Sequence, residues 1–376
     1  MSSSLPADPA AARSLTGVVT HLRASLAGED EWLRPARSAI VFVIDGLGRS
    51  NLAARSGHAR FLAGAMTKKD IARTVFPSTT AAALTSLLTG VDPGMHGIVG
   101  YRLRIPGTDE APNQLKGWES HGLDPLTWQR AEPLFASESR AGRPCFVVTK
   151  SEYENTGFTE ATLRGAAFIA ADDLDERIER AAEAAARHSG ALVYLYAPEL
   201  DSLGHRYGWE SDEWSAGLER VDAAAQRLSQ LIAPRTGVVI TADHGMVDVP
   251  RHRHLLLRDG DGLTDGVRVI GGEPRMLHLY AEPGEAAAVH AAWLAAESGR
   301  SWVLTRDEAV QAGLFGPTDP EVRPRIGDVL VAARAGIAYY DDRARDKRPQ
   351  RMVGQHGSIT AEERIVPLIR LGAYAG

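Results

Sequence analysis

The chain has 376 residues, and at roughly 150 residues per domain this length allows two to three domains or one large α/β domain with insertions. Its 42 Lys and Arg residues against 48 Asp and Glu residues give a net charge of −6, which argues against a basic nucleic-acid platform, and its 44% hydrophobic content argues against intrinsic disorder. The single cysteine, Cys145, excludes an intrachain disulfide framework and a cysteine-rich zinc site, so Asp, Glu and the 12 histidines must supply any metal ligands.

The first residues and the hydropathy of the chain indicate where the protein acts. Residues 1–13 are rich in Ser, Ala and Pro, and they have neither the basic region nor the apolar region of a secretory signal. No stretch approaches the ~20 consecutive apolar residues that a membrane-spanning helix needs. We therefore expect a cytoplasmic protein that has no membrane partner.

Four short apolar runs are the predicted strands of a central sheet, because runs apolar on both faces are typical of covered parallel strands. They are Ala39–Ile44, Cys145–Thr149, Ala191–Ala197 and Gly237–Ala242. Helical patterns lie between them, at Ala81–Leu88, Leu174–His188 and Trp214–Ile232. This alternation predicts an α/β fold in which helices sandwich a mostly parallel β-sheet, as a single domain over residues 1–376.

Two segments depart from this alternation. Residues 102–129 have weak periodicity and several Pro, Gly, Asn and Asp residues, which predicts a lid-like insertion over the active site. Residues 250–350 are mixed, and we expect them to form an accessory segment beside the substrate site. Within it, strands are predicted at Met276–Tyr280, Ser301–Leu304 and Asp328–Ala333, and a helix at Gly284–Glu297.

Polar residues follow the first and last predicted strands of the sheet. Ligands of such folds bind beyond the carboxyl ends of the strands. Asp45 follows the first strand directly, although an Asp-Gly pair there is also typical of a simple turn. The adjacent Asp243 and His244 follow the last strand, and both are costly to bury unless they are paired or bind a metal.

Three further residues complete a candidate metal site. Asp201 and His205 are four residues apart in a predicted helical turn, which places them on one face as chelators, or alternatively as a helix cap and a surface histidine. His356 stands in a glycine-flanked loop and gains meaning only as a member of this set. Together the six residues offer three ligands to each of two divalent ions. Enzymes that transfer phosphoryl groups commonly hold two such ions ~4 Å apart. Mixed carboxylate and imidazole ligands suit zinc, with manganese as the alternative.

A hydroxyl nucleophile is predicted just before the helix over Ala81–Leu88. Ser78, Thr79 and Thr80 stand there, and a hydroxyl at a helix N-terminus meets free backbone N–H groups that also favour phosphate. The alternative is an ordinary helix cap. The local sequence does not choose among the three hydroxyls.

Five motifs in this order, IVFVIDGLG, FPSTTAAALTSLLTGVDPGMHGIVGY, LDSLGHRYG, TADHGM and QHGS, resemble the alkaline phosphatase superfamily. Its type I phosphodiesterase/nucleotide pyrophosphatase branch is the most similar, over residues 38–370. The family nucleophile stands nine residues before the Thr of a Thr-Gly pair. Since that pair is Thr89-Gly90 here and 89 − 9 = 80, the resemblance implies Thr80 as nucleophile.

The resemblance also divides the predicted ligands between two metals. It implies that Asp45, Asp243 and His244 hold the metal that activates Thr80, and that Asp201, His205 and His356 hold the other. His96 belongs to the similar segment and is expected to be structural or to support the site.

One departure from the family pattern concerns contact with the phosphate. Phosphodiesterase relatives carry Thr-Phe-Pro-Asn, in which the Asn contacts phosphate. Here Phe76-Pro77 precede Thr80, and Ala83 occupies the position of that Asn, so another residue must contact the phosphate.

These features predict a two-metal hydrolase that cleaves phosphodiester or phosphoanhydride bonds of small-molecule phosphate esters through a phosphothreonine intermediate. The alternatives are a phosphomonoesterase or phosphonate hydrolase of the same superfamily, and a non-catalytic metal-binding protein. Thr80 argues against a sulfatase, which needs Cys or Ser at that position.

Overall fold

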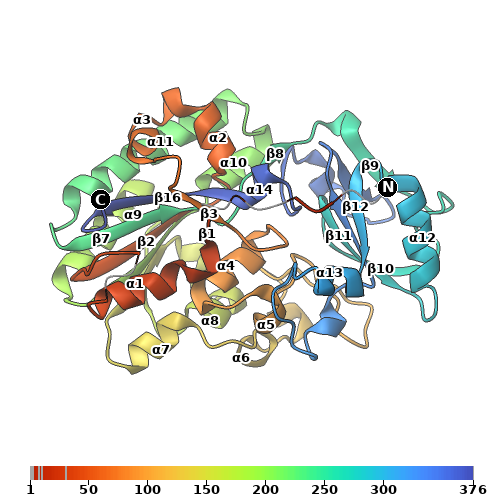
Figure 1. The fold of residues 1–376 in the computed structure, drawn as a ribbon, viewed down its shortest axis with the longest axis horizontal. Coiled ribbons are helices and arrows are strands. Elements are labelled where there is room, and N and C mark those ends of the chain that lie inside the picture. The colour runs from red at the N-terminus through yellow and green to blue at the C-terminus, as the bar shows by residue number, and fades with distance from the viewer. Residues whose placement is uncertain (1–3, 7–8, 10–11, 30–31, 376) are drawn as a thin grey trace.

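An eight-stranded sheet forms the centre of the larger lobe of this computed structural model, which describes residues 4–6, 9, 12–29 and 32–375 (Figure 1). In spatial order the strands are β1 (Arg13–Ser14), β3 (Ile71–Arg73), β16 (Ile365–Gly372), β7 (Thr236–Thr241), β2 (Ser38–Ile44), β6 (Leu192–Ala197), β4 (Cys145–Thr149) and β5 (Ala167–Ala170). The five strands from β7 to β5 are parallel, and β16 runs antiparallel to both of its neighbours. The predicted α/β class with a mostly parallel sheet is confirmed.

Helices cover both faces of this sheet (Figure 1). One face carries α2 (Arg49–Ala54), α3 (Arg60–Ala65), α9 (Leu174–Arg187), α10 (Glu199–Tyr207) and α11 (Asp212–Leu231). The other carries α1 (Val18–Leu26), α4 (Thr80–Thr89), α5 (Pro93–His96), α6 (Pro125–Trp128), α7 (Leu134–Arg140) and α8 (Gly157–Leu163). None of the described helices has the length and apolarity that crossing a membrane requires.

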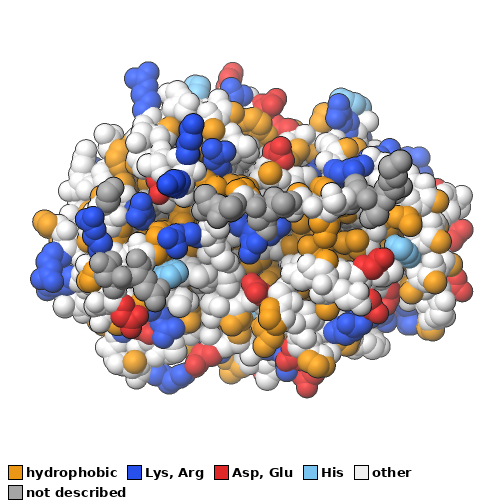
Figure 2. Space-filling view, viewed as in Figure 1, with side chains coloured by type: hydrophobic (Ala, Val, Ile, Leu, Met, Phe, Trp, Pro, Cys, Tyr) orange, Lys and Arg blue, Asp and Glu red, His pale blue; other side chains and the backbone are white. Residues whose placement is uncertain are grey.

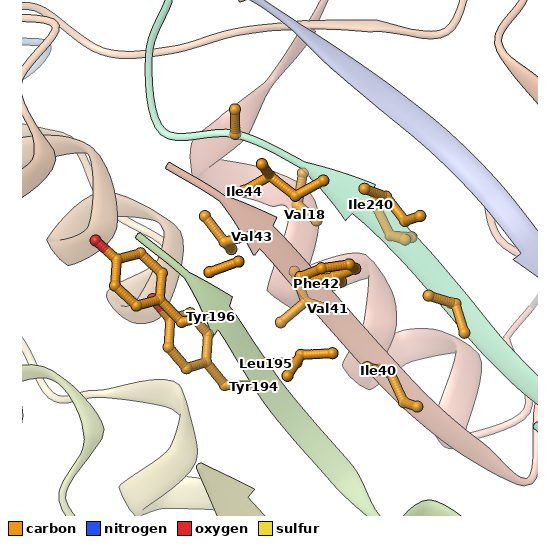
Figure 3. Packing of buried hydrophobic residues seen from close by; sticks show 14 of the residues in the cluster. Val18, Ile40, Val41, Phe42, Val43, Ile44, Tyr194, Leu195, Tyr196 and Ile240 are labelled. Carbon is orange, nitrogen blue, oxygen red and sulfur yellow. The ribbon is translucent and has the colours of Figure 1, made fainter. Parts of the chain in front are cut away.

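The central strands are apolar on both faces because both faces are covered. All seven residues of β2 are buried, and Figure 3 shows Ile40–Ile44 between the strand that carries Leu195 and the strand that carries Ile240. Each fully buried Val, Ile or Phe side chain stabilises the fold by about 1.5–3 kcal/mol relative to exposure. In register, Val43 lies opposite Thr241 and Ile44 opposite Ala197, so β2, β6 and β7 end together at one edge of the sheet.

A smaller lobe, on the right of Figure 1, is built on a four-stranded antiparallel sheet. Its strand order is β10 (Val267–Glu273), β11 (Met276–Ala281), β13 (Val329–Ala333) and β12 (Ser301–Thr305). Helix α12 (Ala286–Glu297) packs on this sheet through Trp293, and α13 (Arg306–Gln311) follows β12. The predicted strands and helix of this region are observed, with bounds that differ by one or two residues.

Short strand pairs and one short helix join the two lobes. They are β9 (His254–Leu257) with β14 (Ala338–Asp341), β8 (Val247–Asp248) with β15 (Gly354–Gln355), and α14 (Ala361–Arg364). Residues 102–129 contain little regular structure apart from α6, one turn of 3-10 helix at Glu119–His121 and an isolated bridge between Arg102 and Asn113. Figure 2 shows Lys and Arg side chains dispersed over the visible face among Asp, Glu and hydrophobic side chains.

Candidate active site

Three predicted ligands meet where β2 and β7 end. Asp45 follows β2, and its N–H donates to Ala197 O of β6 at 3.0 Å. Asp243 and His244 follow β7, and Asp243 Oδ1 accepts from Gly46 N at 3.2 Å. His244 Nε2 lies 3.5 Å from Asp45 Oδ1 and 3.5 Å from Asp243 Oδ2. The ligand atoms of these three buried residues lie within 4.8 Å of one another, which is close enough to share one cation.

Thr80 lies beside this group. It is the first residue of α4, and Thr79 before it is extended and makes no capping bond with its side chain. Thr80 Oγ1 lies 3.0 Å from His244 Nε2. The Thr80 hydroxyl thus faces the predicted ligands rather than capping the helix, while the free backbone N–H groups of α4 lie beside it.

A second group of ligands lies beside the first. Asp201 and His205 are four residues apart on α10, and Asp201 Oδ1 lies 3.3 Å from His205 Nε2. His356 Nε2 lies 3.8 Å from the same carboxylate oxygen. The imidazole of His356 stacks on that of His244, with ring centroids 3.6 Å apart. The ligand atoms of Asp201, His244 and His356 lie within 4.8 Å of one another, and the ring centroid of His205 lies 5.2 Å from that of His356.

All three histidines turn the same ring nitrogen towards the site. In each, Nδ1 donates to a backbone carbonyl, which fixes the proton on Nδ1 and leaves Nε2 with a lone pair. These bonds join His205 to Gly354 O at 2.8 Å, His244 to Gly245 O at 3.1 Å and His356 to Ser78 O at 2.9 Å. With Nδ1 protonated, His244 accepts from the Thr80 hydroxyl.

The electrostatics of the cluster fit a cation. Asp45 Oδ1, Asp201 Oδ1 and Asp243 Oδ2 are buried and have no hydrogen-bond partner among the described residues. Burial, and then the negative charges of Asp243 and Asp201, raise the pKa of Asp45 well above its usual range. Burial, followed by His244 and His205, lowers the pKa of His356 well below its usual range. Three carboxylate oxygens without a hydrogen-bond partner lie beside the Nε2 atoms of three histidines, and this set of oxygen and nitrogen donors suits divalent cations.

One cavity of about 680 Å³ opens onto both groups of ligands and Thr80. Its far wall comes from residues 115–119 and 152–159, which contribute Leu115, Trp118, Tyr153 and Phe158. Lys116 is the one lysine or arginine among the described residues of the lining. This cavity has room for a phosphate ester whose organic groups contact an aromatic wall.

Three residues of the site were not predicted from the sequence. Tyr196 donates its hydroxyl to Asp45 Oδ2, and its place next to the end of a predicted strand was a usable signal. Tyr101 ends the segment PGMHGIVGY and lines the cavity. Glu273 comes from β10 of the smaller lobe, is buried, and places Oε2 3.7 Å from His356 Nδ1. No local pattern marks Glu273, because only the packing of the two lobes brings it here.

His96 supports the helix that carries Thr80. It is buried, its Nε2 pairs with Ser86 Oγ of α4 at 2.8 Å, and its Nδ1 accepts from Ile98 N at 3.1 Å. Burial lowers the pKa of His96 to about 3, so the ring is neutral. This agrees with the predicted structural role.

Comparison with known proteins places this geometry in a family. Residues 39–359 match the model of the family described as type I phosphodiesterase/nucleotide pyrophosphatase. An uncharacterised pyrophosphatase/phosphodiesterase of Schizosaccharomyces pombe is 25% identical over 190 residues, which are 48% of this chain and 39% of that protein. The chain matches less than half the length of such curated relatives.

Two solved structures share the fold. Murine ectonucleotide pyrophosphatase/phosphodiesterase 5 superposes with a TM-score of 0.69 at 17% identity, covering 89% of this chain and 88% of that one. Phosphonoacetate hydrolase from Sinorhizobium meliloti superposes with a TM-score of 0.65 at 20% identity, covering 90% and 91%. The family match spans most of the chain, including all six predicted ligands and Thr80. The chain therefore belongs to the type I phosphodiesterase/nucleotide pyrophosphatase family.

Proposed function

We propose that this protein is a two-metal hydrolase that cleaves phosphodiester or phosphoanhydride bonds of small molecules through a phosphothreonine intermediate on Thr80. The observation that carries the proposal is the position of Thr80 Oγ1, 3.0 Å from His244 Nε2 at the N-terminus of α4, where His244 belongs to both groups of Asp and His side chains that could hold a cation. An inactive threonine-to-alanine variant of the murine relative has been solved in complex with AMP, which supports both a threonine nucleophile and a phosphate-ester ligand.

Six residues would hold the metals. Asp45, Asp243 and His244 would bind the cation nearer Thr80, and Asp201, His205 and His356 the other. Oxygen and imidazole ligands favour zinc, with manganese as the alternative. When bound, the two cations supply Lewis-acid charge that offsets the negative charge of the attacking and leaving oxygens.

The chain's own residues then carry out two displacements. Deprotonated Thr80 Oγ1 forms a bond to phosphorus as the bond to the leaving oxygen breaks and that oxygen takes the electron pair. Water next attacks phosphorus from the opposite side, the bond to Thr80 Oγ1 breaks, and the threonine regains its proton. Backbone N–H groups at the start of α4 lie beside Thr80 and favour the anionic phosphoryl group.

The charge of the cavity favours diesters over monoesters. A phosphomonoester dianion carries one more negative charge than a diester and needs additional donors. Lys116 is the one lysine or arginine in the described lining, whereas Glu119 and Glu152 add negative charge. A diester or anhydride with a larger leaving group also fills more of the 680 Å³ cavity.

The test compares hydrolysis of bis-p-nitrophenyl phosphate and p-nitrophenyl phosphate by wild type, Thr80→Ala and Thr80→Ser. We expect faster turnover of the diester, a loss of roughly 10³-fold or more in Thr80→Ala, and partial activity in Thr80→Ser, which keeps a hydroxyl. Elemental analysis should find two metals per chain in all three proteins.

Each contrary result overturns a defined part of the proposal. Near wild-type turnover by Thr80→Ala refutes the nucleophile. A large preference for the monoester refutes the diesterase assignment. Fewer than two metals per chain together with no turnover supports the non-catalytic alternative.

A further inference from the structure

Tyr101 lines the cavity without a role in the site described so far. Tyr101 ends the segment that follows α5, and its side chain is mostly buried. It shares the cavity lining with Thr80, Asp201 and Glu273, and it is close enough to the last two carboxylates to interact with their charge. Tyr101 therefore shares one cavity with the predicted nucleophile and a predicted metal ligand.

The backbone around Tyr101 is fixed by the segment that begins residues 102–129. Gln114 N donates to Tyr101 O at 2.8 Å, and Arg102 forms an isolated antiparallel bridge with Asn113. Two stretches of chain are thus clamped together directly behind the tyrosine. The clamp places the Asn113 amide against the Tyr101 hydroxyl.

The direction of the hydrogen bond between these two side chains follows from a third group. Leu115 N donates to Asn113 Oδ1 at 2.8 Å, so that oxygen must face Leu115 and the amide nitrogen must face the tyrosine. Asn113 Nδ2 then donates to Tyr101 Oη at 2.6 Å. Because an amide N–H2 group cannot accept, the hydroxyl proton of Tyr101 points elsewhere, and the described residues offer no acceptor for it.

We propose that Tyr101 donates this proton in a hydrogen bond to a non-bridging oxygen of the phosphoryl group attached to or approaching Thr80, with Asn113 as its positioning residue. The inference rests on the proposed function. It accounts for the missing phosphate contact noted in the sequence. Ala83 stands where relatives carry an Asn that contacts the phosphate, and it is a buried residue of α4 with no polar side chain. In this chain a tyrosine hydroxyl takes over the contact.

The chemistry of the donor suits this role. Burial raises the pKa of Tyr101, so the hydroxyl remains protonated over the neutral and mildly alkaline range. A neutral donor aimed at an anionic oxygen forms a short, charge-assisted hydrogen bond. Negative charge spreads over the three equatorial oxygens during phosphoryl transfer, so a donor held in advance at one of them stabilises the transition state.

The central experiment measures Tyr101→Phe, which removes only the hydroxyl. We expect kcat/KM for bis-p-nitrophenyl phosphate to fall roughly 10²-fold, mainly through kcat. Binding of orthovanadate, measured by titration calorimetry, should weaken by about the same factor, while metal content stays at the wild-type level. Tyr207→Phe, at the exposed end of α10 and outside the cavity lining, is the matched control and should behave as wild type.

Asn113 is tested by reversing its hydrogen bond. In Asn113→Asp the carboxylate still accepts from Leu115 N but also accepts the Tyr101 proton, which removes the donor from the cavity. We expect a loss in kcat/KM similar to that of Tyr101→Phe, and little further loss when Asn113→Asp is added to Tyr101→Phe. An equal loss in both backgrounds refutes the positioning role of Asn113.

The outcomes separate this inference from the function on which it rests. If the wild type hydrolyses the diester, and Tyr101→Phe has the same kcat/KM and the same orthovanadate affinity as the wild type, only the role of Tyr101 is overturned. No wild-type turnover, together with weaker orthovanadate binding by Tyr101→Phe, overturns the hydrolase function and keeps Tyr101 as an oxyanion-binding residue. If Tyr101→Phe leaves both turnover and orthovanadate binding at the wild-type level, the inference is wrong, whether or not the wild type is an active hydrolase.

Discussion

A buried ion pair between the two lobes should contribute strongly to stability and to the position of His356. Arg275, in the turn between β10 and β11, and Glu363 of α14 are 1% and 0% exposed, and they meet through two bonds of 2.8 and 2.9 Å. Arg275 also donates to the backbone carbonyls of Ala333, Ala335 and Ile337. Glu363 accepts in addition from Ser358 N at 2.9 Å, two residues after His356.

Replacing Arg275 with Met leaves a buried carboxylate and three carbonyls without this partner. Breaking a buried pair by removing one partner costs about 3–5 kcal/mol, and we expect Arg275→Met to lower the free energy of unfolding by that amount. Glu363→Met should cost about as much, because it strands the guanidinium. The double variant strands no charge, so its loss should be about 2–3 kcal/mol smaller than the sum of the two single losses.

The assay is equilibrium unfolding in urea, followed by fluorescence of the buried Trp214 and Trp293 in the larger and smaller lobes. Coincident transitions for the four proteins justify comparing free energies. Because Ser358 N is held by Glu363, both single variants should also bind less than the full complement of metal. Additive losses in the double variant, or a loss below about 1 kcal/mol in Arg275→Met, would refute the reasoning.

Three further predictions concern pH, metal and a glycine at the site. Burial lowers the pKa of both His96 and His278 to about 3, so each ring stays neutral in the folded protein but takes up a proton in the unfolded chain below pH 6.5. The free energy of unfolding should therefore fall as the pH decreases from 6.5 towards 3, by about 1.4 kcal/mol per pH unit for each ring. His96→Gln should reduce this slope in acid denaturation curves. Removal of metal by a chelator should abolish hydrolysis and lower the thermal unfolding midpoint, because carboxylates without partners then lie buried together. Added zinc should restore both the activity and the midpoint. An unchanged midpoint would count against a cation bound between these carboxylates. Gly357→Ala should reduce metal content and turnover, because φ is +123° at this position and a Cβ would lie 2.5 Å from Glu273 Cδ. The control Gly57→Ala, which places its Cβ in open space, should leave both unchanged.

The parts of the fold that were predictable are those whose residues carry a one-dimensional pattern. The run over Ala39–Ile44 became β2 because a strand covered on both faces must be apolar at every position. Strand β16 was not predicted, although its residues are mostly apolar. Pro367 interrupts its pattern, and its antiparallel place between β3 and β7 is set by pairing across nearly the whole length of the chain.

The residues of the candidate site fall into the same two classes, those that a sequence pattern places and those that only tertiary packing places. Asp45, Asp201 and Asp243 follow or flank predicted strands, so the common edge of a parallel sheet was enough to place them together. Tyr101 and Glu273 reach the cavity from segments whose position depends on tertiary packing. Their roles are invisible in sequence, since a tyrosine after a Gly-rich stretch and a glutamate before a proline each occur in ordinary turns.

The smaller lobe therefore forms part of the candidate active site. It supplies Glu273 to the cavity wall, and the next turn supplies Arg275, whose partner Glu363 holds the loop that carries His356. His356 in turn donates from Nδ1 to Ser78 O, two residues before Thr80. A continuous series of contacts thus links the smaller lobe to the predicted nucleophile. Substitutions within this series should change metal binding and turnover together, whereas substitutions in α12, on the far side of the small sheet, should change stability alone.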